Sequence, residues 1–313
     1  MNHFRFVFNN YLILKKIEVM RKFIFLFITM VLCITSGRVS AQKTNTLAYR
    51  VGNYEIVLLS EGQQKGNPSV LIGATPEILQ ETIPEGSYPT ATNAFLIKTP
   101  DKIYLIDTGF GRNLWENIKS AGVSADQIHT IIITHMHGDH IGGLLIDGEK
   151  AFPNSQLILS EAEYAYWTSN EEMNKLPENR RGNFLSAQGV VKAYAGQLQL
   201  IQPEKLQEKS SDDIYIIEAY GHTPGHVACL LKSGNEQLLI WADLIHVPAV
   251  QLLYPHISVT YDVNPEQAAK TRKEFLEYAA KHKIPVAGMH LPYPSMGKVQ
   301  AVSDSGYAFT PVQ

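Results

Sequence analysis

The chain has 313 residues, of which 45% are hydrophobic and 18% are charged, an ordinary composition for a globular protein with a buried core. This composition excludes a disordered chain, a collagen-like repeat and a coiled coil. The net charge of -3 argues against general nucleic-acid binding, and two cysteines are too few for a disulfide framework.

The N-terminal segment has the pattern of an export signal. A short apolar run, residues 23–34, follows two basic residues. A transmembrane helix needs about 20 apolar residues, whereas the apolar part of a signal peptide needs about 7–15. Val39-Ser40-Ala41 is a small-x-small cleavage pattern. We therefore predict that residues 1–41 are a leader with a signal peptide, that translation starts at Met20, and that cleavage follows Ala41. An uncleaved anchor is the alternative.

Removal of this leader would leave a more acidic protein. The mature chain, starting at Gln42, would keep 21 basic and 29 acidic residues, a net charge of -8. We expect a periplasmic or secreted protein with no nucleic-acid partner and no stable membrane insertion after cleavage. Cys229 would be its only cysteine. Since it lies in an apolar strand pattern, we expect a buried, inert thiol.

In the first part of the chain, apolar runs separated by Gly, Pro and Asn predict strands, and capped or periodic segments predict helices. The predicted strands are 54–59, 94–97, 103–106, 129–134 and 156–159, and the predicted helices are 114–121, 161–167 and 183–194. Ser124 with Gln127, and Ser160 with Glu163, have the spacing of capping boxes. A polar stretch, 169–181, lies between the last two helices.

The second part continues the alternation. The predicted strands are 214–219, 227–231, 238–241 and 284–287. Asn264-Pro265-Glu266 predicts the start of a helix that runs to about residue 281, since it offers an N-cap, a proline at the first helical position and an acid in the first turn. Strands and helices alternate in two groups without an internal repeat. We therefore predict one layered α/β domain over residues 42–313.

A cluster of histidines directly follows the apolar strand 129–134. His135 and His137 are two positions apart, so an extended backbone points both side chains the same way. Asp139 and His140 follow after a glycine and can face a second point. Imidazole and carboxylate groups together suit Zn²⁺ and related metals. Four candidate ligands from one turn are too many for a single open site, which predicts two adjacent metal ions.

The pattern HxHxDH resembles the signature of the metallo-β-lactamase superfamily, and further motifs of that superfamily occur in order. Residues 93–97 and 105–109 resemble its opening strands, and Gly221-His222-Thr223-Pro224-Gly225-His226 resembles its third metal motif. Asp243 and His290, each after a predicted strand, match its bridging carboxylate and its last ligand. The resemblance implies a four-layer αββα sandwich.

The resemblance also implies the metal ligands and the cofactor. One metal is expected on His135, His137 and His222, the second on Asp139, His140 and His290, with Asp243 bridging the two. The family favours His222 over His226 as the ligand. The implied cofactor is two divalent metal ions, zinc foremost, although manganese, iron and cobalt also suit such ligands.

Such a centre predicts a hydrolase. A metal ion lowers the pKa of bound water to about 7, so no Ser or Cys nucleophile is required. We expect a hydroxide bridging the two metals to cleave an ester, lactone or phosphotriester bond of a small-molecule substrate. Asp139 and His246 are predicted as catalytic residues.

His246 also bears on the branch of the family. It stands three residues after Asp243, where acyl-homoserine lactonases of the superfamily often carry a tyrosine that polarises the lactone. His246, together with 268–272 and 288–294, resembles the methyl parathion hydrolase branch, which includes phosphotriesterases and lactonases. The resemblance disfavours β-lactam cleavage and a glyoxalase II activity.

Two other functions are weighed. A mononuclear-iron persulfide dioxygenase-like oxidoreductase of the same superfamily would leave Asp139, His140 and the last histidine out of the metal shell, whereas this chain has the whole second set. A non-catalytic metal-binding protein has no support from an intact ligand set. A homodimer is the default expectation for assembly.

Some residues keep two interpretations. Asp107 ends a predicted strand and either bonds a metal ligand, fixing its ring, or caps a turn. Several aromatic residues of the insertion 160–194 either line the substrate pocket or pack between helices, and helical spacing favours packing. They are Tyr164, Tyr166, Trp167 and Phe184.

Overall fold

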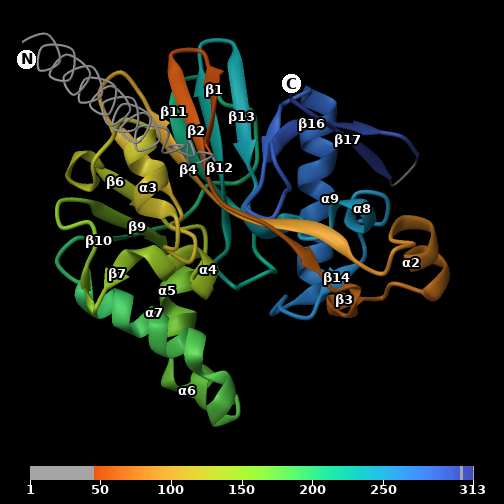
Figure 1. Ribbon diagram of the computed structural model, residues 1–313, viewed down its shortest axis with the longest axis horizontal. Helices are drawn as coiled ribbons and strands as arrows, with labels where there is room; N and C mark the ends of the chain where they lie inside the picture. Colours follow the sequence, from red (N-terminus) through yellow and green to blue (C-terminus); the bar gives the residue numbers. More distant parts are fainter. Residues whose placement is uncertain (1–45, 304–305, 313) are drawn as a thin grey trace, which may run out of the picture. The chain divides into compact units, whose positions relative to one another are not determined.

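The computed structural model describes residues 46–303 and 306–312 (Figure 1). The predicted leader, its start at Met20 and its cleavage site after Ala41 lie outside the described residues. Within the described residues, no helix combines the length and the apolar character needed to cross a membrane.

The first half of the chain forms a seven-stranded sheet in the order β1-β2-β4-β5-β6-β9-β10. The strands from β1 to β5 pair antiparallel, and those from β5 to β10 pair parallel. The strands are β1 (Thr46–Val51), β2 (Tyr54–Gly66), β4 (Tyr88–Lys98), β5 (Ile103–Ile106), β6 (Thr130–Ile132), β9 (Gln156–Ser160) and β10 (Leu198–Ile201).

The second half forms a six-stranded sheet in the order β11-β12-β13-β15-β16-β17. Its pairs are antiparallel except for β13 with β15. The strands are β11 (Asp213–Glu218), β12 (Val227–Ser233), β13 (Glu236–Ile240), β15 (Val286–Ala287), β16 (Met296–Ala301) and β17 (Tyr307–Pro311).

Alternating side chains of the inner strands fill three separate cores, as strands apolar on both faces require. In β6, Ile132 packs between the two sheets, whereas Ile131 packs on the outer side of the first sheet. In β12, Leu231 lies between the sheets and Leu230 on the outer side of the second sheet. Both central strands are therefore covered on each face.

Helices cover the two outer faces (Figure 1). The first sheet is covered by α3 (Leu114–Ser120), α5 (Glu161–Thr168) and α7 (Gly182–Ala193), and the second by α9 (Pro265–His282). The molecule therefore has four layers, helix, sheet, sheet and helix, which confirms the predicted α/β fold.

A smaller unit lies beside the C-terminal end of β2 and the N-terminal end of β4 (Figure 1). It has a two-stranded sheet and two short helices, around a core that includes Tyr88 and Val250. These elements are β3 (Leu71–Ile72), α2 (Pro76–Thr82), α8 (Pro248–Gln251) and β14 (Ser258–Val259). This unit joins residues 67–83 to residues 247–262, which brings both segments to the rim of the site described below.

The helix starts follow the sequence closely, with one exception. Asn264 caps α9 and accepts a hydrogen bond from the Gln267 amide, and the box of Ser124 with Gln127 is formed. Ser160 accepts from the Glu163 amide, but the Glu163 carboxylate does not return to residue 160. It is used elsewhere, because four other donors surround it.

Two of the differences from expectation have a local cause. The first predicted strand, 54–59, continues to Gly66 in β2, because a bulge after Ser60 lets pairing with β4 resume at Gln63 despite the polar sequence. The polar stretch 169–181 contains α6 (Asn170–Asn174), which Ser169 caps by accepting from the Glu172 amide.

Candidate metal centre

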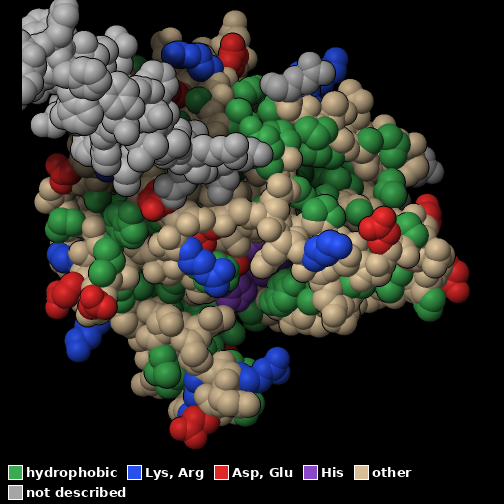
Figure 2. Space-filling model, in the orientation of Figure 1, with side chains coloured by type: hydrophobic (Ala, Val, Ile, Leu, Met, Phe, Trp, Pro, Cys, Tyr) green, Lys and Arg blue, Asp and Glu red, His purple; other side chains and the backbone are tan. Residues whose placement is uncertain are grey.

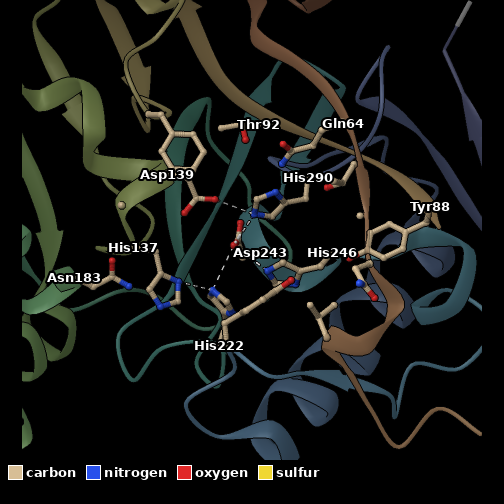
Figure 3. Close-up of a pocket in the computed structure, with 17 residues that line it drawn as sticks. Gln64, Tyr88, Thr92, His137, Asp139, Asn183, His222, Asp243, His246 and His290 are labelled. Carbon is tan, nitrogen blue, oxygen red and sulfur yellow. Dashed lines mark hydrogen bonds and ion pairs between the residues drawn. The ribbon is translucent and has the colours of Figure 1, made fainter. Parts of the chain in front are cut away.

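The structure brings the seven predicted ligands together at one end of the two sheets. Figure 3 shows those that line the pocket, which are His137, Asp139, His222, Asp243 and His290. The loop after β6 carries His135 and His137, and α4 (Gly138–Ile141) carries the next two ligands. His222 lies between β11 and β12, Asp243 follows β13, and His290 follows β15. Strand ends from both sheets thus hold the cluster on rigid elements.

The first group of donors contains three imidazoles and one carboxylate, whose ligand atoms all lie within 4.8 Å of one another. His137 Nδ1 lies 3.0 Å from His135 Nε2 and 3.0 Å from His222 Nε2. Asp243 Oδ2 lies 3.3 Å from His222 Nε2 and 3.6 Å from His135 Nε2. Three nitrogens and a carboxylate oxygen that converge on one point match the donor chemistry of zinc and related ions.

The second group contains Asp139, His140 and His290. Asp139 Oδ2 lies 3.8 Å from His140 Nε2 and 3.6 Å from His290 Nε2. Asp243 stands between the groups, because its Oδ1 lies 3.3 Å from His140 Nε2 while its Oδ2 lies 3.0 Å from His290 Nε2. A carboxylate with one oxygen or the other within 3.6 Å of four of the five ligand rings can serve two ions at once.

Outer partners orient the rings of the second group. His290 Nδ1 lies 2.9 Å from the carbonyl of Ala91, which can only accept, so this nitrogen donates. His140 Nδ1 lies 2.7 Å from the Asp107 carboxylate. When the ring is neutral, each bond keeps the N–H on Nδ1 and leaves the Nε2 lone pair toward the centre. Asp107 also accepts from the Thr134 amide. Its contact with His140 is the first of its two predicted roles, the bond to a proposed metal ligand.

The ring of His222 has a hydrogen-bond partner that the sequence did not predict. Its Nδ1 lies 2.8 Å from Oδ1 of Asp262, a buried residue whose other oxygen accepts from the Val259 amide. The guanidinium of the buried Arg272 lies 3.7 Å from Asp262 and also donates to backbone carbonyls. No spacing in the sequence relates Asp262 to the ligands, because the small unit at the rim brings it there.

The pKa values favour neutral rings with free lone pairs at two histidines of the first group. Burial holds the pKa of His135 and His137 well below the ordinary value, so both rings are neutral near pH 7. Burial also opposes the charged forms of His140 and His290, but the carboxylates, Asp243 first, raise the pKa of His140 well above its ordinary value and that of His290 to about 9. A cation in the second group would therefore displace protons.

Two buried polar atoms without hydrogen-bond partners are suited to binding a cation. His140 Nε2 and Asp243 Oδ1 are buried, and neither has a hydrogen-bond partner among the described residues. Burial alone would raise the pKa of Asp243, yet the imidazoles around it, His140 first, hold its pKa well below the ordinary value. Unpartnered buried groups are costly, and a metal ion would satisfy both. The donor set therefore fits two metal ions.

His246 lies beside the cluster. Its Nε2 is 3.0 Å from Asp243 Oδ2, and its ring stacks on that of His290 at 4.9 Å between centroids. Its backbone amide donates to the buried Gln251 side chain, which fixes the loop. Burial lowers the pKa of His246 to about 4. A neutral imidazole therefore contacts the Asp243 carboxylate from the pocket side.

His226 is placed differently, although it is also buried. Its Nδ1 donates to the carbonyl of Ala219, and its Nε2 accepts from the Asp243 amide. Both nitrogens are therefore occupied, and His226 belongs to none of the candidate metal groups. Of the two histidines in the motif 221–226, the structure places His222 in the cluster.

The cluster forms the floor of a pocket of about 410 Å³. Figure 2 shows histidine side chains in a recess in the middle of this face. Besides the centre, the lining has amides, hydroxyls and apolar side chains, and no Lys or Arg: Gln64, Gly66, Asn67, Val70, Tyr88, Thr90, Thr92, Phe110, Gly138, Asn183 and Tyr261. Arg112 lies over the Phe110 ring, 4.6 Å from the ring centroid, and is not in the lining.

Most of these lining residues come from β2, β4 and the small unit, where no motif marks them, so the sequence did not predict them. Phe110, Gly138 and Asn183 come instead from the loop after β5, from α4 and from α7. The four aromatic residues considered for the pocket lie instead in the core outside the first sheet. Trp167 and Phe184 are buried there, with ring centroids 4.7 Å apart, and Tyr164 and Tyr166 pack against them. None of the four lines the pocket.

Two solved structures are similar to most of this chain. The hydrolase AbOPH of the beta lactamase superfamily has 26% sequence identity and a TM-score of 0.78, covering 87% of this chain and 99% of that one. AidC, a dizinc quorum-quenching lactonase solved with the product N-hexanoyl-L-homoserine, has 27% identity and a TM-score of 0.77, covering 86% and 97%.

Curated relatives match shorter segments. The lactamase-like protein PtaB of Pestalotiopsis fici is 32% identical over 93 residues, 27% of this chain and 29% of that protein. An N-acyl homoserine lactonase of a Bacillus species is 28% identical over 129 residues, 40% and 43% of the two chains. The chain thus spans less than half the length of these two relatives.

A family profile covers more of the sequence. The profile described as the Metallo-beta-lactamase superfamily matches residues 87–283, more than half of the chain. This match includes six of the seven clustered ligands and leaves out His290, which the structure brings to the same centre. The chain belongs to the metallo-beta-lactamase superfamily.

Proposed function

We propose that this protein is a dinuclear metal-dependent hydrolase of uncharged small molecules that contain an ester, lactone or phosphotriester bond. The observation that carries the proposal is the double donor set around Asp243 at the floor of the pocket. The complete second set, with His290, favours two metals over the mononuclear-iron oxidoreductase and gives no support to a non-catalytic protein. Zinc is the proposed metal, as AidC is described as dizinc.

The proposed roles divide between binding the metals and orienting the binders. His135, His137 and His222 would hold one ion, Asp139, His140 and His290 the other, and Asp243 would contact both. When bound, two such ions lower the pKa of water and stabilise negative charge on the attacking and leaving oxygens.

His246 would act beside the metals, as the contact with Asp243 supports. Its neutral ring holds the bridging carboxylate through Nε2. Its buried Nδ1 has no hydrogen-bond partner among the described residues, so the ring keeps a free polar atom beside the pocket. The carboxylate can only accept, so Nε2 carries the proton of the neutral ring and Nδ1 is left as an acceptor. This atom could therefore accept from a hydroxyl or a water molecule, but it could not bond an ester or phosphoryl oxygen. Its own pKa of about 4 keeps it uncharged near neutral pH.

The pocket wall supports an uncharged substrate. Among the lining residues, the amides of Gln64, Asn67 and Asn183 can bond a carbonyl or phosphoryl oxygen, while Phe110 and Val70 offer apolar contact. No Lys or Arg of the lining would pair with a carboxylate or a phosphodiester. A lactone or a phosphotriester suits this wall better than an anionic β-lactam.

Rates on matched substrates test the proposal. We would assay zinc-loaded protein on N-hexanoyl-L-homoserine lactone, 4-nitrophenyl acetate and dimethyl 4-nitrophenyl phosphate, with bis(4-nitrophenyl) phosphate as the anionic comparison. At least one neutral substrate should be hydrolysed with kcat/KM far above that of the diester, and Asp243→Ala should abolish the activity. Equal rates for the protein and its Asp243→Ala variant would overturn the proposal.

Export and assembly are further parts of the proposal. The sequence pattern at Val39-Ser40-Ala41 supports cleavage after Ala41 and a periplasmic or secreted location for a domain that begins at Gln42. A homodimer is proposed only as the commonest assembly of soluble proteins, and size-exclusion chromatography with light scattering tests it.

A further inference from the structure

A buried glutamate outside the ligand set connects the two loops that carry the first group of donors. Glu163 lies in α5 with 0% of its surface exposed. Its Oε1 accepts from the Met136 amide at 2.9 Å and from the Trp167 indole. Its Oε2 accepts from the Thr223 hydroxyl at 2.7 Å and from the Gly225 amide at 2.9 Å.

The positions of these donors relate Glu163 to the centre. Met136 stands between His135 and His137, and Thr223 directly follows His222. One oxygen therefore holds the first ligand loop, and the other holds the second. The indole of Trp167 also meets the His137 ring edge to face, with centroids 5.5 Å apart.

The second loop is pressed against the start of α5. A Cβ on Gly225 would lie 2.0 Å from the Glu163 nitrogen, so only glycine allows this approach. The hydroxyl of Ser160 donates to the Gly225 carbonyl at 2.6 Å. Ser160 and Glu163 thus bind the second loop with the first turn of a helix, which explains why the carboxylate does not complete a capping box.

The chemistry of the contact requires a carboxylate. An ionised carboxylate is an acceptor at both oxygens, and all four neighbours are donors. A glutamine of the same shape would keep one acceptor oxygen and turn an NH₂ group toward the other pair. The Thr223 hydroxyl could rotate to accept from it, but the amide of Gly225, or that of Met136, would be left facing another donor.

We propose that Glu163 is a positioning residue that sets the distance between the loop of His135 and His137 and the loop of His222. This inference rests on the proposed metal centre. Glu163 touches no proposed ligand side chain, so it acts through backbone and neighbours. Its loss should weaken metal binding in the way that outer partners of ligands do, by roughly ten- to hundredfold.

Glu163→Gln tests this role, with Ser155→Ala as the matched control. The Ser155 hydroxyl is buried in the same half of the molecule and donates to the Ile128 carbonyl at 2.6 Å, at a place without proposed ligands. Both variants lose a buried hydrogen bond. The metal-free form of each is titrated with Co²⁺, followed by its visible absorption, and its thermal midpoint is measured.

We expect Glu163→Gln to bind Co²⁺ roughly ten- to hundredfold more weakly, with an altered spectrum, and Ser155→Ala to bind it like the parent. Parental affinity and spectrum in Glu163→Gln, at a lowered thermal midpoint, would overturn the inference and leave Glu163 as a core residue. If the parent itself bound no Co²⁺, the proposed function would fail instead, so the two failures are distinguishable.

A milder variant keeps the test decisive if Glu163→Gln does not fold. Thr223→Val removes one of the four donors and leaves Glu163 in place. Thr223→Ser, a separate variant, keeps the hydroxyl. We expect weaker Co²⁺ binding in Thr223→Val and parental binding in Thr223→Ser. Unchanged binding in Thr223→Val would overturn the inference.

Discussion

The Nδ1 atom of His140 lies 2.7 Å from Oδ2 of Asp107, on the side of the ring opposite to the Nε2 atom that faces Asp243. The Asp107 carboxylate accepts from this ring and from both the amide and the hydroxyl of Thr134. Each of its neighbours is therefore a donor, and the carboxylate fixes which nitrogen of His140 carries the proton.

Asp107→Asn should weaken metal binding by roughly tenfold or more. An amide NH₂ in place of one oxygen would face His140 Nδ1 or the Thr134 amide, and the first arrangement reverses the tautomer of the ring. Competition with a chromophoric chelator measures the affinity. Thr134→Ser, which keeps the hydroxyl, is the control and should bind metal like the parent. Parental affinity in Asp107→Asn would contradict this role.

His246→Ala and Asp243→Ala should separate metal binding from rate. Asp243 lies between both groups of donors, so its loss should release metal. His246 contacts the carboxylate at 3.0 Å without being needed for either proposed set, so its loss should keep both metals and lower kcat/KM by ~10²-fold. Metal content and kcat/KM are measured on one preparation. Full activity in His246→Ala would make this residue a bystander.

Purified protein should carry close to two transition-metal ions per chain, because two groups of donors share Asp243. Ions that bind only the folded protein stabilise it by about 4 kcal/mol each at a thousandfold excess over Kd. Chelation should therefore lower the thermal midpoint, and zinc should restore it. Elemental analysis gives the stoichiometry. One tight ion under metal-replete conditions, with His290 away from it, would exclude the dinuclear assignment.

Cys229 should resist thiol reagents in the folded protein. It is fully buried, and burial raises the pKa of its thiol far above the ordinary value, so the reactive thiolate is not formed even at pH 9. We expect no reaction with a disulfide reagent at pH 7–9, and one thiol per mature chain after unfolding in guanidinium. Rapid labelling of the native protein would contradict the burial.

Protein isolated from its native host should begin at Gln42. The prediction depends on the apolar run 23–34 and on Val39-Ser40-Ala41. N-terminal sequencing of the soluble fraction tests it. Recovery of the protein in membranes with residues 23–34 still attached would favour the uncleaved anchor.

Much of the fold was predictable, because its inner strands are marked by composition. β5 and β12 are apolar runs bounded by turns, and the start of α9 has every helix-start signal in three residues. The sequence predicted the edge strand β11, but it did not predict β1, β10, β16, β17 or the strands of the small unit. β3 and β14 are two-residue strands that pair across a long sequence separation, and no local pattern encodes such a contact.

The residues of the site likewise divide into those that a local sequence pattern marks and those that only the tertiary structure reveals. The clustered ligands carry a spacing or a family motif, and the structure brings them together. Asp262 and Glu163 carry neither, because what matters about them is the tertiary position of a carboxylate next to His222 or Met136. The capping-box spacing of Glu163 even indicated a different use for its side chain.

The division of the chain into two sheets has a consequence for how the centre forms. The stretch 202–212 separates β10 from β11, and four of the clustered ligands precede it while His222, Asp243 and His290 follow it (Figure 1). Neither the residues before this stretch nor those after it contain all the proposed ligands of either ion. Full coordination of either ion therefore requires that both sheets have folded and packed against each other. Metal binding can serve as a measure of that packing.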